Sequence, residues 1–298
     1  MYLIREYEEN GLGISRGASI EILAPAKLNL LLNIVGVRED GYHELFSIFT
    51  PVSLYDILKI AKIESGVKIY WRGRKLQDKQ DNLIYRAALC FFEKTGINNG
   101  VRITVDKKIP ISSGLGGGSS DAAATLKALN RLWGNPLSKK GLEKLALSLG
   151  ADVPFFLLQR PAIVRGIGEI LEPIDNFPDI WYAIVSPRLM VSTEWAYKNT
   201  KLDLTKIKNQ DIMTDFRKEV FKNPDMLSND LEAATFERYP FLGSIKTSLL
   251  KLGAFSALMT GSGPSVFGLF RTSEEAFKAS KIFELRKDSD VFVVEGLH

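Results

Sequence analysis

The glycine-rich stretch at residues 114–120, Gly-Leu-Gly-Gly-Gly-Ser-Ser, constrains the fold of this chain more than any other feature. Residues 101–105 before it alternate apolar and polar side chains, which predicts a half-buried strand. After it, apolar side chains recur at helical spacing up to Trp133. A strand, a glycine turn and a helix start gather free backbone N–H groups and the positive end of a helix dipole in one place. This arrangement binds anions, so we interpret the loop as a phosphate site, with a flexible glycine linker as the alternative.

Three well-known phosphate-binding signatures do not match this stretch. The chain contains no GxxxxGK[ST] sequence, which excludes a Walker A loop. Ser119 stands where the dinucleotide-binding fingerprint needs glycine or alanine. The HRD and DFG motifs of protein kinases are also missing. Ser119 and Ser120 nevertheless offer hydroxyls to phosphate oxygens, and Ser120 is the one candidate ligand for a metal ion whose other ligands stay unknown.

The composition is that of a folded protein, and it limits the classes of binding partner that we expect. Its 298 residues suggest two domains, and 45% apolar with 25% charged residues suffice to bury a core. The net charge of +4 does not argue for nucleic-acid binding, but it suits anionic small molecules. The single cysteine, Cys90, allows no intramolecular disulfide and favours a reducing compartment, so we expect a cytoplasmic protein. No apolar run approaches the ~20 residues that span a bilayer, so no membrane association is expected.

The order of segments predicts two series of strands and helices. The first has strands at 19–23, 28–37, 48–54, 56–61, 67–71, 101–105, 162–165 and 169–174, and helices at 83–92, 122–133 and 138–149. A boundary is expected at 176–179, around Pro178. The second has strands at 181–185, 255–259, 266–270 and 291–294, and helices near 192–199, 211–222, 238–252 and 273–284. Residues 1–17 are expected to be a polar extension, either a short helix or a frayed tail, and we assign them no function.

Residues 110–123 resemble the second motif of the GHMP small-molecule kinases, which are named for galactokinase, homoserine, mevalonate and phosphomevalonate kinases. Residues 24–30, Ala-Pro-Ala-Lys-Leu-Asn-Leu, resemble the first motif, and residues 260–267, Thr-Gly-Ser-Gly-Pro-Ser-Val-Phe, resemble the third. Three motifs in the family's order make the resemblance specific. It implies an α+β fold of two domains with the active site in the interdomain cleft. The nucleotide-binding domain would span residues 18–175, and the C-terminal domain would span residues 176–298.

Further segments are similar to one branch of this family only. They are Gly-Tyr-His-Glu-Leu at 41–45, Asp-Asn-Leu-Ile at 81–84, and the segments at 150–156, 166–169 and 228–232. The branch uses ATP to phosphorylate the 2-hydroxyl of 4-diphosphocytidyl-2-C-methyl-D-erythritol in the non-mevalonate isoprenoid pathway, with Mg²⁺ on the ATP phosphates. The resemblance therefore implies a small-molecule substrate with a cytidine diphosphate group. We further expect no nucleic-acid partner and a monomer or weak homodimer.

Two charged residues match the catalytic pair of the family. Lys27 enters an otherwise apolar strand, where it needs an anionic partner unless its ammonium group reaches solvent. Asp152 follows the glycine that ends a predicted helix, and by itself it would fit the cap of the next helix. By resemblance, Lys27 is the catalytic lysine, while Asp152 contacts the substrate and accepts the proton of the attacking hydroxyl.

The resemblance assigns the substrate site to three segments. Tyr42 would stack on the cytosine, and His43 would hydrogen-bond to its edge; the alternative is a turn histidine paired with Glu44. A Ser-His-Asp triad is not supported, because no GxSxG elbow accompanies His43. Asn29, an amide in a buried strand, would lie near the reacting hydroxyl. The third segment is a glycine turn that otherwise serves only to connect two strands: Gly261, Ser262 and Gly263.

The nucleotide site implied by the resemblance centres on the glycine loop. Asn82 would meet the adenine together with the region of Lys107, although Asn82 alone also fits a helix start. Asp121 is well placed to complement the helix dipole, which by itself accounts for an acid there. The complete expected set is Asn82, Lys107, Pro110, Ser113, Gly114, Leu115, Gly116, Gly117, Gly118, Ser119 and Ser120.

Two alternatives to this function stay open at this point. One is a different GHMP kinase, with homoserine or mevalonate as the acceptor, and the loop at 41–45 argues against it. The other is a non-catalytic nucleotide-binding or RNA-binding module on the same scaffold. The small net charge without a basic stripe argues against RNA, and the presence of Lys27 and Asp152 argues against an inactive kinase.

Overall fold

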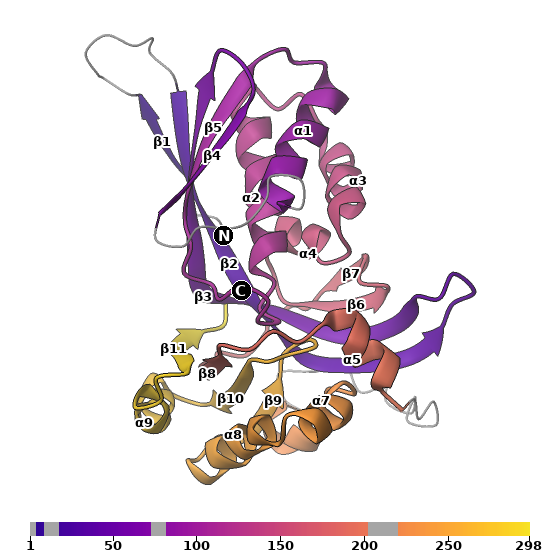
Figure 1. Cartoon of the computed structure of the whole chain (residues 1–298), viewed down its shortest axis with the longest axis vertical. Helices are drawn as coiled ribbons and strands as arrows, with labels where there is room; N and C mark the ends of the chain where they lie inside the picture. The colour runs from indigo at the N-terminus through magenta and orange to yellow at the C-terminus, as the bar shows by residue number, and fades with distance from the viewer. Residues whose placement is uncertain (1–3, 9–17, 73–81, 202–219) are drawn as a thin grey trace. The chain divides into compact units, whose positions relative to one another are not determined.

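The computed structural model describes residues 4–8, 18–72, 82–201 and 220–298, and the chain forms two compact units (Figure 1). Unit 1 is built from residues 1–26, 54–109 and 116–159, and unit 2 from residues 27–53, 110–115 and 160–298. Two long strands, β2 (Ala18–Val37) and β3 (His43–Ile63), contribute one part to each unit. Each unit is therefore assembled from segments that are distant in the sequence.

The strands of unit 1 come from the N-terminal part of the chain. β1 (Ile4–Glu8) pairs antiparallel with the start of β2, with Ile4 opposite Ile22. The end of β3 pairs antiparallel with β5 (Gly100–Asp106), and β5 pairs in parallel with β4 (Val67–Arg72). Every second side chain of β5, at Val101, Ile103 and Val105, is fully buried. This confirms the half-buried strand that the alternation predicts.

The helices α1 (Leu83–Thr95), α2 (Gly117–Leu132), α3 (Lys139–Leu149) and α4 (Val153–Leu158) pack on one another and cover one face of these strands (Figure 1). α1 begins at its cap Asn82 and ends at Gly96, whose φ of 69° is the left-handed conformation of a glycine C-cap. The buried alanines of α2, from Ala122 to Ala128, leave room for α1 and α4 to approach it closely.

Two expectations about the strands are wrong in detail. Residues 4–8 form a strand, not a helix or tail, because β2 offers them a pairing edge. The pairs of short strands expected at 19–37 and 48–61 are the single strands β2 and β3. The first continues past Pro25 because the fixed φ of proline is compatible with extended backbone. The helix expected at 238–252 is confirmed as α8 (Pro240–Lys251), which Pro240 begins, while the preceding helix α7 (Glu232–Arg238) was not expected.

Unit 2 is dominated by an antiparallel four-stranded sheet with the order β11-β8-β10-β9. Its strands are β8 (Trp181–Pro187), β9 (Ser256–Met259), β10 (Val266–Phe270) and β11 (Ser289–Glu295). Val266 lies opposite Val185 on one side and Met259 on the other. The strands β9 and β10 run into and out of the second glycine turn, at residues 260–265, so this register fixes the position of the turn at one end of the sheet.

The helices of unit 2 bury the apolar core of this sheet. α8 packs on β9 and β10, and α9 (Ser273–Glu284) packs on β8 and β11. A capping box between Thr272 and Glu275 begins α9. The first part of β3 pairs with β6 (Ala162–Gly166), which pairs with β7 (Ile170–Pro173). The remaining elements are α5 (Thr193–Asn199) and a short 3₁₀ turn, η2 (Pro224–Met226); most of the helix expected at 211–222 lies outside the described residues.

Candidate active site

The second half of the glycine loop begins α2 in unit 1. Gly116 occupies the cap position with a φ of 71°, and no side chain among the described residues caps the first turn of the helix. The N–H groups of that turn are therefore open to a ligand. A Cβ atom at Gly117 would lie 2.9 Å from Ile109 Cγ2 and 2.9 Å from Lys107 Nζ, so only glycine fits at this position. The loop therefore forms a helix N-terminus whose backbone a ligand can approach closely, and it is not a flexible linker.

A hydroxyl and a carboxylate oxygen near this helix end are buried without a hydrogen-bond partner among the described residues. They are Ser120 Oγ and Asp121 Oδ1, and neither bonds to any residue that the structure describes. A buried polar atom left unpaired is costly, which points to a group that arrives with the nucleotide. Mg²⁺ prefers oxygen ligands, so the Ser120 hydroxyl is chemically suited to be the metal ligand that we expect there. In the described ranges, no group of three or more His, Cys, Asp and Glu side chains is placed to hold a metal ion by itself.

Lys107 lies beneath the same loop in a buried ion cluster. Its ammonium group bonds to Asp121 Oδ2 at 2.8 Å and to Asp56, and the three side chains are 5%, 2% and 0% exposed respectively. Asp56 also accepts hydrogen bonds from Lys108 N at 2.6 Å and from Ile109 N at 2.9 Å. Thus α2 and the segment after β5 are both fixed to β3. Sequence reasoning missed Asp56, because nothing local marks an acid in a strand as the partner of a lysine 51 residues away.

One lysine cannot neutralise two buried carboxylates. Burial lowers the pKa of Lys107, but attraction to Asp121 and Asp56 outweighs it, so the net shift is upward and the lysine stays charged. Burial, aided by repulsion from Asp56, raises the pKa of Asp121 to about 8 against the opposing effect of Lys107. Asp121 therefore carries a proton at neutral pH more readily than an ordinary aspartate, and its place in this cluster goes beyond the helix-dipole role expected from sequence.

Asn82 and Asp152, also in unit 1, both precede helices. Asn82 Oδ1 accepts a hydrogen bond from Ile84 N at 2.9 Å, which confirms the helix-start interpretation. Asp152 occupies the position before α4, but its side chain makes no capping bond there. Asp152 thus stands at the N-cap position that the alternative expected, but its half-buried side chain does not form the capping hydrogen bond.

In unit 2, Lys27 and Asn29 form a buried polar pair on β2. Lys27 is 4% exposed; its ammonium group donates to Asn29 Oδ1 and lies 4.6 Å from the centre of the Phe49 ring. Its backbone N–H donates to Leu115 O in the glycine loop at 3.0 Å. Lys27 thus does not reach solvent as the alternative supposed, because an amide oxygen and an aromatic face stabilise its charge inside.

Thr260 joins this pair to both glycine segments. Its Oγ1 accepts a hydrogen bond from Asn29 N at 3.2 Å and lies within donating distance of Asn29 Oδ1, at 3.0 Å, and of Gly114 O, at 3.2 Å. A Cβ atom at Gly114, where φ is 82°, would lie 2.2 Å from Thr260 O. The structure therefore brings Lys27, Asn29, Gly114 and the turn together. Sequence reasoning included the turn but missed Thr260, because a threonine at a strand end carries no signal of a partner 231 residues away.

The rest of the turn and loop hold one another in place. Gly261 and Gly263 have φ values of 58° and 86°, which only glycine adopts readily. Ser262 Oγ lies 3.1 Å from Thr193 Oγ1 at the start of α5. Ser113, buried, donates its hydroxyl to Pro110 O at 2.7 Å and accepts Ser265 N on its carbonyl at 3.2 Å. These contacts make Ser113 a connector within unit 2.

Tyr42 and His43 follow a turn, as expected. Gly41 has a φ of 83°, and Tyr42 is 61% exposed, so the face of its ring is available to a ligand. His43 begins β3, and its ring centre lies 5.0 Å from that of Tyr197 in α5. The structure records no bond from His43 to Glu44, so the described residues do not support the alternative of a paired turn histidine.

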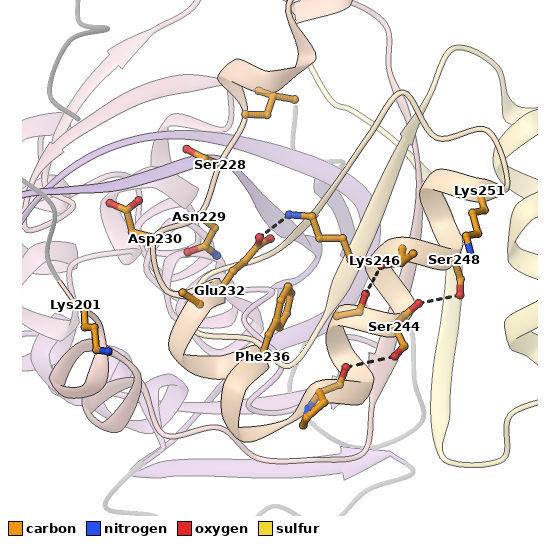
Figure 2. A pocket seen from close by; sticks show the side chains of 15 residues that line it. Lys201, Ser228, Asn229, Asp230, Glu232, Phe236, Ser244, Lys246, Ser248 and Lys251 are labelled. Carbon is orange, nitrogen blue, oxygen red and sulfur yellow. Dashed lines mark hydrogen bonds and ion pairs between the residues drawn. The ribbon is translucent and has the colours of Figure 1, made fainter. Parts of the chain in front are cut away.

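A cavity of about 890 Å³ lies elsewhere in unit 2, between α7, α8 and the segment before α7 (Figure 2). None of the described residues expected at the active site lines it. No helix in the described ranges is both long enough and apolar enough to cross a membrane.

Two domain families match this sequence. The GHMP kinases N terminal domain matches residues 82–160, and the GHMP kinases C terminal domain matches residues 210–285. The 4-diphosphocytidyl-2-C-methyl-D-erythritol kinase of Syntrophotalea carbinolica is 43% identical over 277 residues, covering 93% of this chain and 98% of that protein. The chain belongs to the GHMP kinase family. As a GHMP kinase it is a phosphotransferase, and the α+β fold expected from its motifs is confirmed.

Solved GHMP kinases resemble most of the chain. A crystal structure of 4-(cytidine 5'-diphospho)-2C-methyl-D-erythritol kinase has a TM-score of 0.79 and 35% identity, covering 93% of this chain and 99% of that one. A homoserine kinase from Cytophaga hutchinsonii has a TM-score of 0.74 at 23% identity, covering 97% and 98%, and shows the shared fold alone. Kinases of this family use ATP, so the ATP requirement expected from the motifs is confirmed.

Proposed function

We propose that this GHMP kinase phosphorylates the 2-hydroxyl of 4-diphosphocytidyl-2-C-methyl-D-erythritol in the non-mevalonate isoprenoid pathway. The observation that carries the proposal is the buried group of Lys27, Asn29 and Thr260, joined to the glycine loop at Gly114. It occurs in a chain 43% identical to a relative that bears this substrate in its name. Phosphoryl transfer depends mainly on positioning and charge neutralisation, which a fixed lysine beside a phosphate loop supplies.

Each part of the site has a proposed role in this reaction. The free N–H groups at the start of α2 hold the ATP phosphates, and Asn82 with the Lys107 region lies at the adenine. Lys27 neutralises charge on the transferring phosphoryl group, and Asp152 accepts the proton of the attacking hydroxyl. Ser120 would hold Mg²⁺, which when bound neutralises the phosphate oxygens.

The substrate's cytidine end is assigned to the exposed aromatic turn. Tyr42 stacks on the cytosine, and His43 donates to or accepts from its edge. Asn29 and the turn at Gly261, Ser262 and Gly263 hold the sugar alcohol near the γ-phosphate. We further propose that residues 18–175 form the nucleotide-binding domain and residues 176–298 the C-terminal domain, with the active site in the cleft between them. The protein would act in the cytoplasm as a monomer or weak homodimer without nucleic acid.

A substrate panel tests this proposal. ADP release is measured with the cytidylated alcohol, homoserine and mevalonate under equal ATP and Mg²⁺, with a reaction lacking the acceptor as the control. We expect turnover with the cytidylated alcohol only. Turnover with homoserine or mevalonate instead would show that the kinase reacts with a different acceptor. ATP binding without turnover of any of the three would contradict the substrate assignment altogether.

A further inference from the structure

The segment at residues 228–232, Ser-Asn-Asp-Leu-Glu, has no role in the proposed chemistry, although it is tied directly to the strand of Lys27. Leu32 N of β2 donates to Ser228 O at 2.8 Å, and Asp230 N donates to Leu32 O at 2.9 Å. The carboxylate of Asp230 accepts a hydrogen bond from Ile34 N at 2.8 Å. This ladder fixes the segment against β2, which carries Lys27 and Asn29.

The side chain of Asn229 reaches from this segment to the backbone on both sides of Thr260. Its Nδ2 donates to Met259 O at 2.7 Å and to Gly261 O at 2.8 Å, and its Oδ1 accepts from Leu231 N at 2.9 Å. Asn229 is 5% exposed. The amide has one allowed orientation, because a flip would place its oxygen against two carbonyls and its NH₂ against an N–H. Glutamine carries the same amide group but is one methylene longer, so it would not reach these three backbone groups with the same geometry.

Glu232, the first residue of α7, holds the remaining polar group of Met259. Its Oε1 accepts a hydrogen bond from Met259 N at 2.7 Å, and its Oε2 accepts one from Lys246 of α8. Figure 2 shows Asn229 and Glu232 side by side with Lys246 reaching toward Glu232, all on the wall of the cavity described above. The segment therefore hydrogen-bonds to the N–H and the carbonyl of Met259 and to the carbonyl of Gly261.

The turn needs such support because glycines make it flexible. Gly261 and Gly263 both have positive φ, and each glycine adds backbone freedom that the folded state must restrict. Thr260 reaches Asn29 and Gly114 only while the backbone at 259–261 stays in place. Errors of about 1 Å in such positions cost phosphoryl transfer about a hundredfold.

We propose that Asn229 is a positioning residue for the transfer reaction: with Glu232, it fixes residues 259–261 so that Thr260 holds Asn29 at the acceptor. The proposal rests on the proposed function for the identity of the acceptor, but not for the contacts. Asn229 itself touches neither ATP nor substrate in this assignment. Its effect passes through the turn, and loss of its bonds should therefore change turnover with little effect on ATP binding.

The test variant is Asn229→Asp, which keeps the shape and the bond to Leu231 N but replaces both donors with an oxygen facing two carbonyls. The matched control is Asn33→Asp. Asn33 donates to Ser228 Oγ at 3.1 Å and to Asp230 Oδ1 at 3.2 Å, so the same substitution perturbs the same segment without touching the turn. Both variants are compared with the wild type in steady-state kinetics, thermal melting and hydrogen–deuterium exchange of the peptide covering residues 259–265.

We expect Asn229→Asp to lower kcat about 10- to 100-fold, with KM for ATP within about twofold and faster exchange in the turn. Asn33→Asp should melt earlier than the wild type, yet keep kcat within about threefold and normal exchange in the turn. Equal kcat values for the two variants, or unchanged exchange in Asn229→Asp, would overturn the proposal. If the wild type fails to phosphorylate the cytidylated alcohol, the proposed function is wrong, and the exchange measurement alone decides whether Asn229 holds the turn.

A second pair of variants covers the case in which Asn229→Asp does not fold. Glu232→Gln keeps an oxygen for Met259 N, whereas Glu232→Ala removes it. We expect the glutamine variant to retain kcat within about threefold and the alanine variant to lose about tenfold. If both lose the same amount, Glu232 acts only through its ion pair with Lys246, and its part in holding the turn is refuted.

Discussion

Replacing Lys107 by methionine should destabilise the protein strongly. Methionine keeps the length and apolar stem of the lysine but removes the charge that Asp56 and Asp121 share. Asp56 retains two backbone donors, Lys108 N and Ile109 N, so it can stay ionised. Asp121 has no such support, because its Oδ1 bonds to none of the described residues and its Oδ2 would lose the lysine. The variant thus leaves a buried carboxyl group that must either take up a proton or remain unpaired.

The size of the effect follows from this burial. The three side chains are at most 5% exposed, so water cannot replace the lost cation. Removing one partner of a buried ion pair costs about 3–5 kcal/mol, a large part of the ~5–15 kcal/mol that stabilises a typical domain. Asp121→Asn, by contrast, leaves one lysine with one carboxylate and an amide oxygen for the second bond. We expect that variant to be close to neutral, and the double variant Lys107→Met/Asp121→Asn to lose less than Lys107→Met alone.

Urea unfolding at pH 5, 7 and 9 tests this reasoning, with equal m-values as the condition for comparing variants. The folded-state pKa of Asp121 is raised from 3.8 to about 8, so the folded state binds more protons than the unfolded state between these values. The stability of the wild type should therefore fall as pH rises from 5 to 8 and level off above, and Asp121→Asn should lack this decline. The reasoning is refuted if Lys107→Met lies within about 1 kcal/mol of the wild type, or if Asp121→Asn is equally damaging.

Three further outcomes are expected from the proposed function. Asp152→Ala should lower kcat by about 10²–10⁴ with near-normal ATP affinity, and combining it with Lys27→Ala should be less than additive; wild-type turnover in Asp152→Ala would exclude it as the base. Gly117→Val should raise the Kd for ATP, because its side chain blocks the approach of phosphate, and it should also lower the melting temperature, because the side chain meets Ile109 and Lys107; an unchanged Kd would show that the loop does not hold the phosphates. Tyr42→Ala and His43→Ala should each raise KM for the cytidylated substrate about three- to a hundredfold and leave KM for ATP within about twofold, whereas parallel losses for both substrates would make the pair structural.

Local patterns were enough to predict the elements that frame the site. The alternation at 101–105 and the glycines at 114–118 predicted β5 and the start of α2, because a strand period and a loss of side chains are visible in a few neighbouring residues. The strand expected at 266–270 and the helix expected at 273–284 have the same bounds in the structure. The domain boundary near residue 176 and the assigned roles of the site residues stay predictions.

The contacts that fix the site were not visible in the same way. Asp56 and Thr260 lie 51 and 231 residues from their partners, and Asn229 lies 32 from Gly261, so no local spacing relates them. Asp121 shows what a single sequence does not reveal. Its place near the start of α2 suggested a helix-dipole role, and only the fold shows that Lys107 bonds to it. Long-range pairing is decided by how strands and helices assemble, which a single sequence does not reveal.

Unit 2 is assembled from segments that are distant in the sequence, and this affects how the protein folds while the ribosome synthesises it. Asn29 is synthesised 231 residues before Thr260, to which it bonds. Leu32 and Ile34 of the strand that carries Lys27 belong to one core with Met259 of β9 and Val266 of β10, so this core cannot form until those strands are made. Contacts between such distant residues slow folding and prolong exposure to aggregation. A nascent chain arrested before residue 256 should thus depend on chaperones in a way that the finished protein does not.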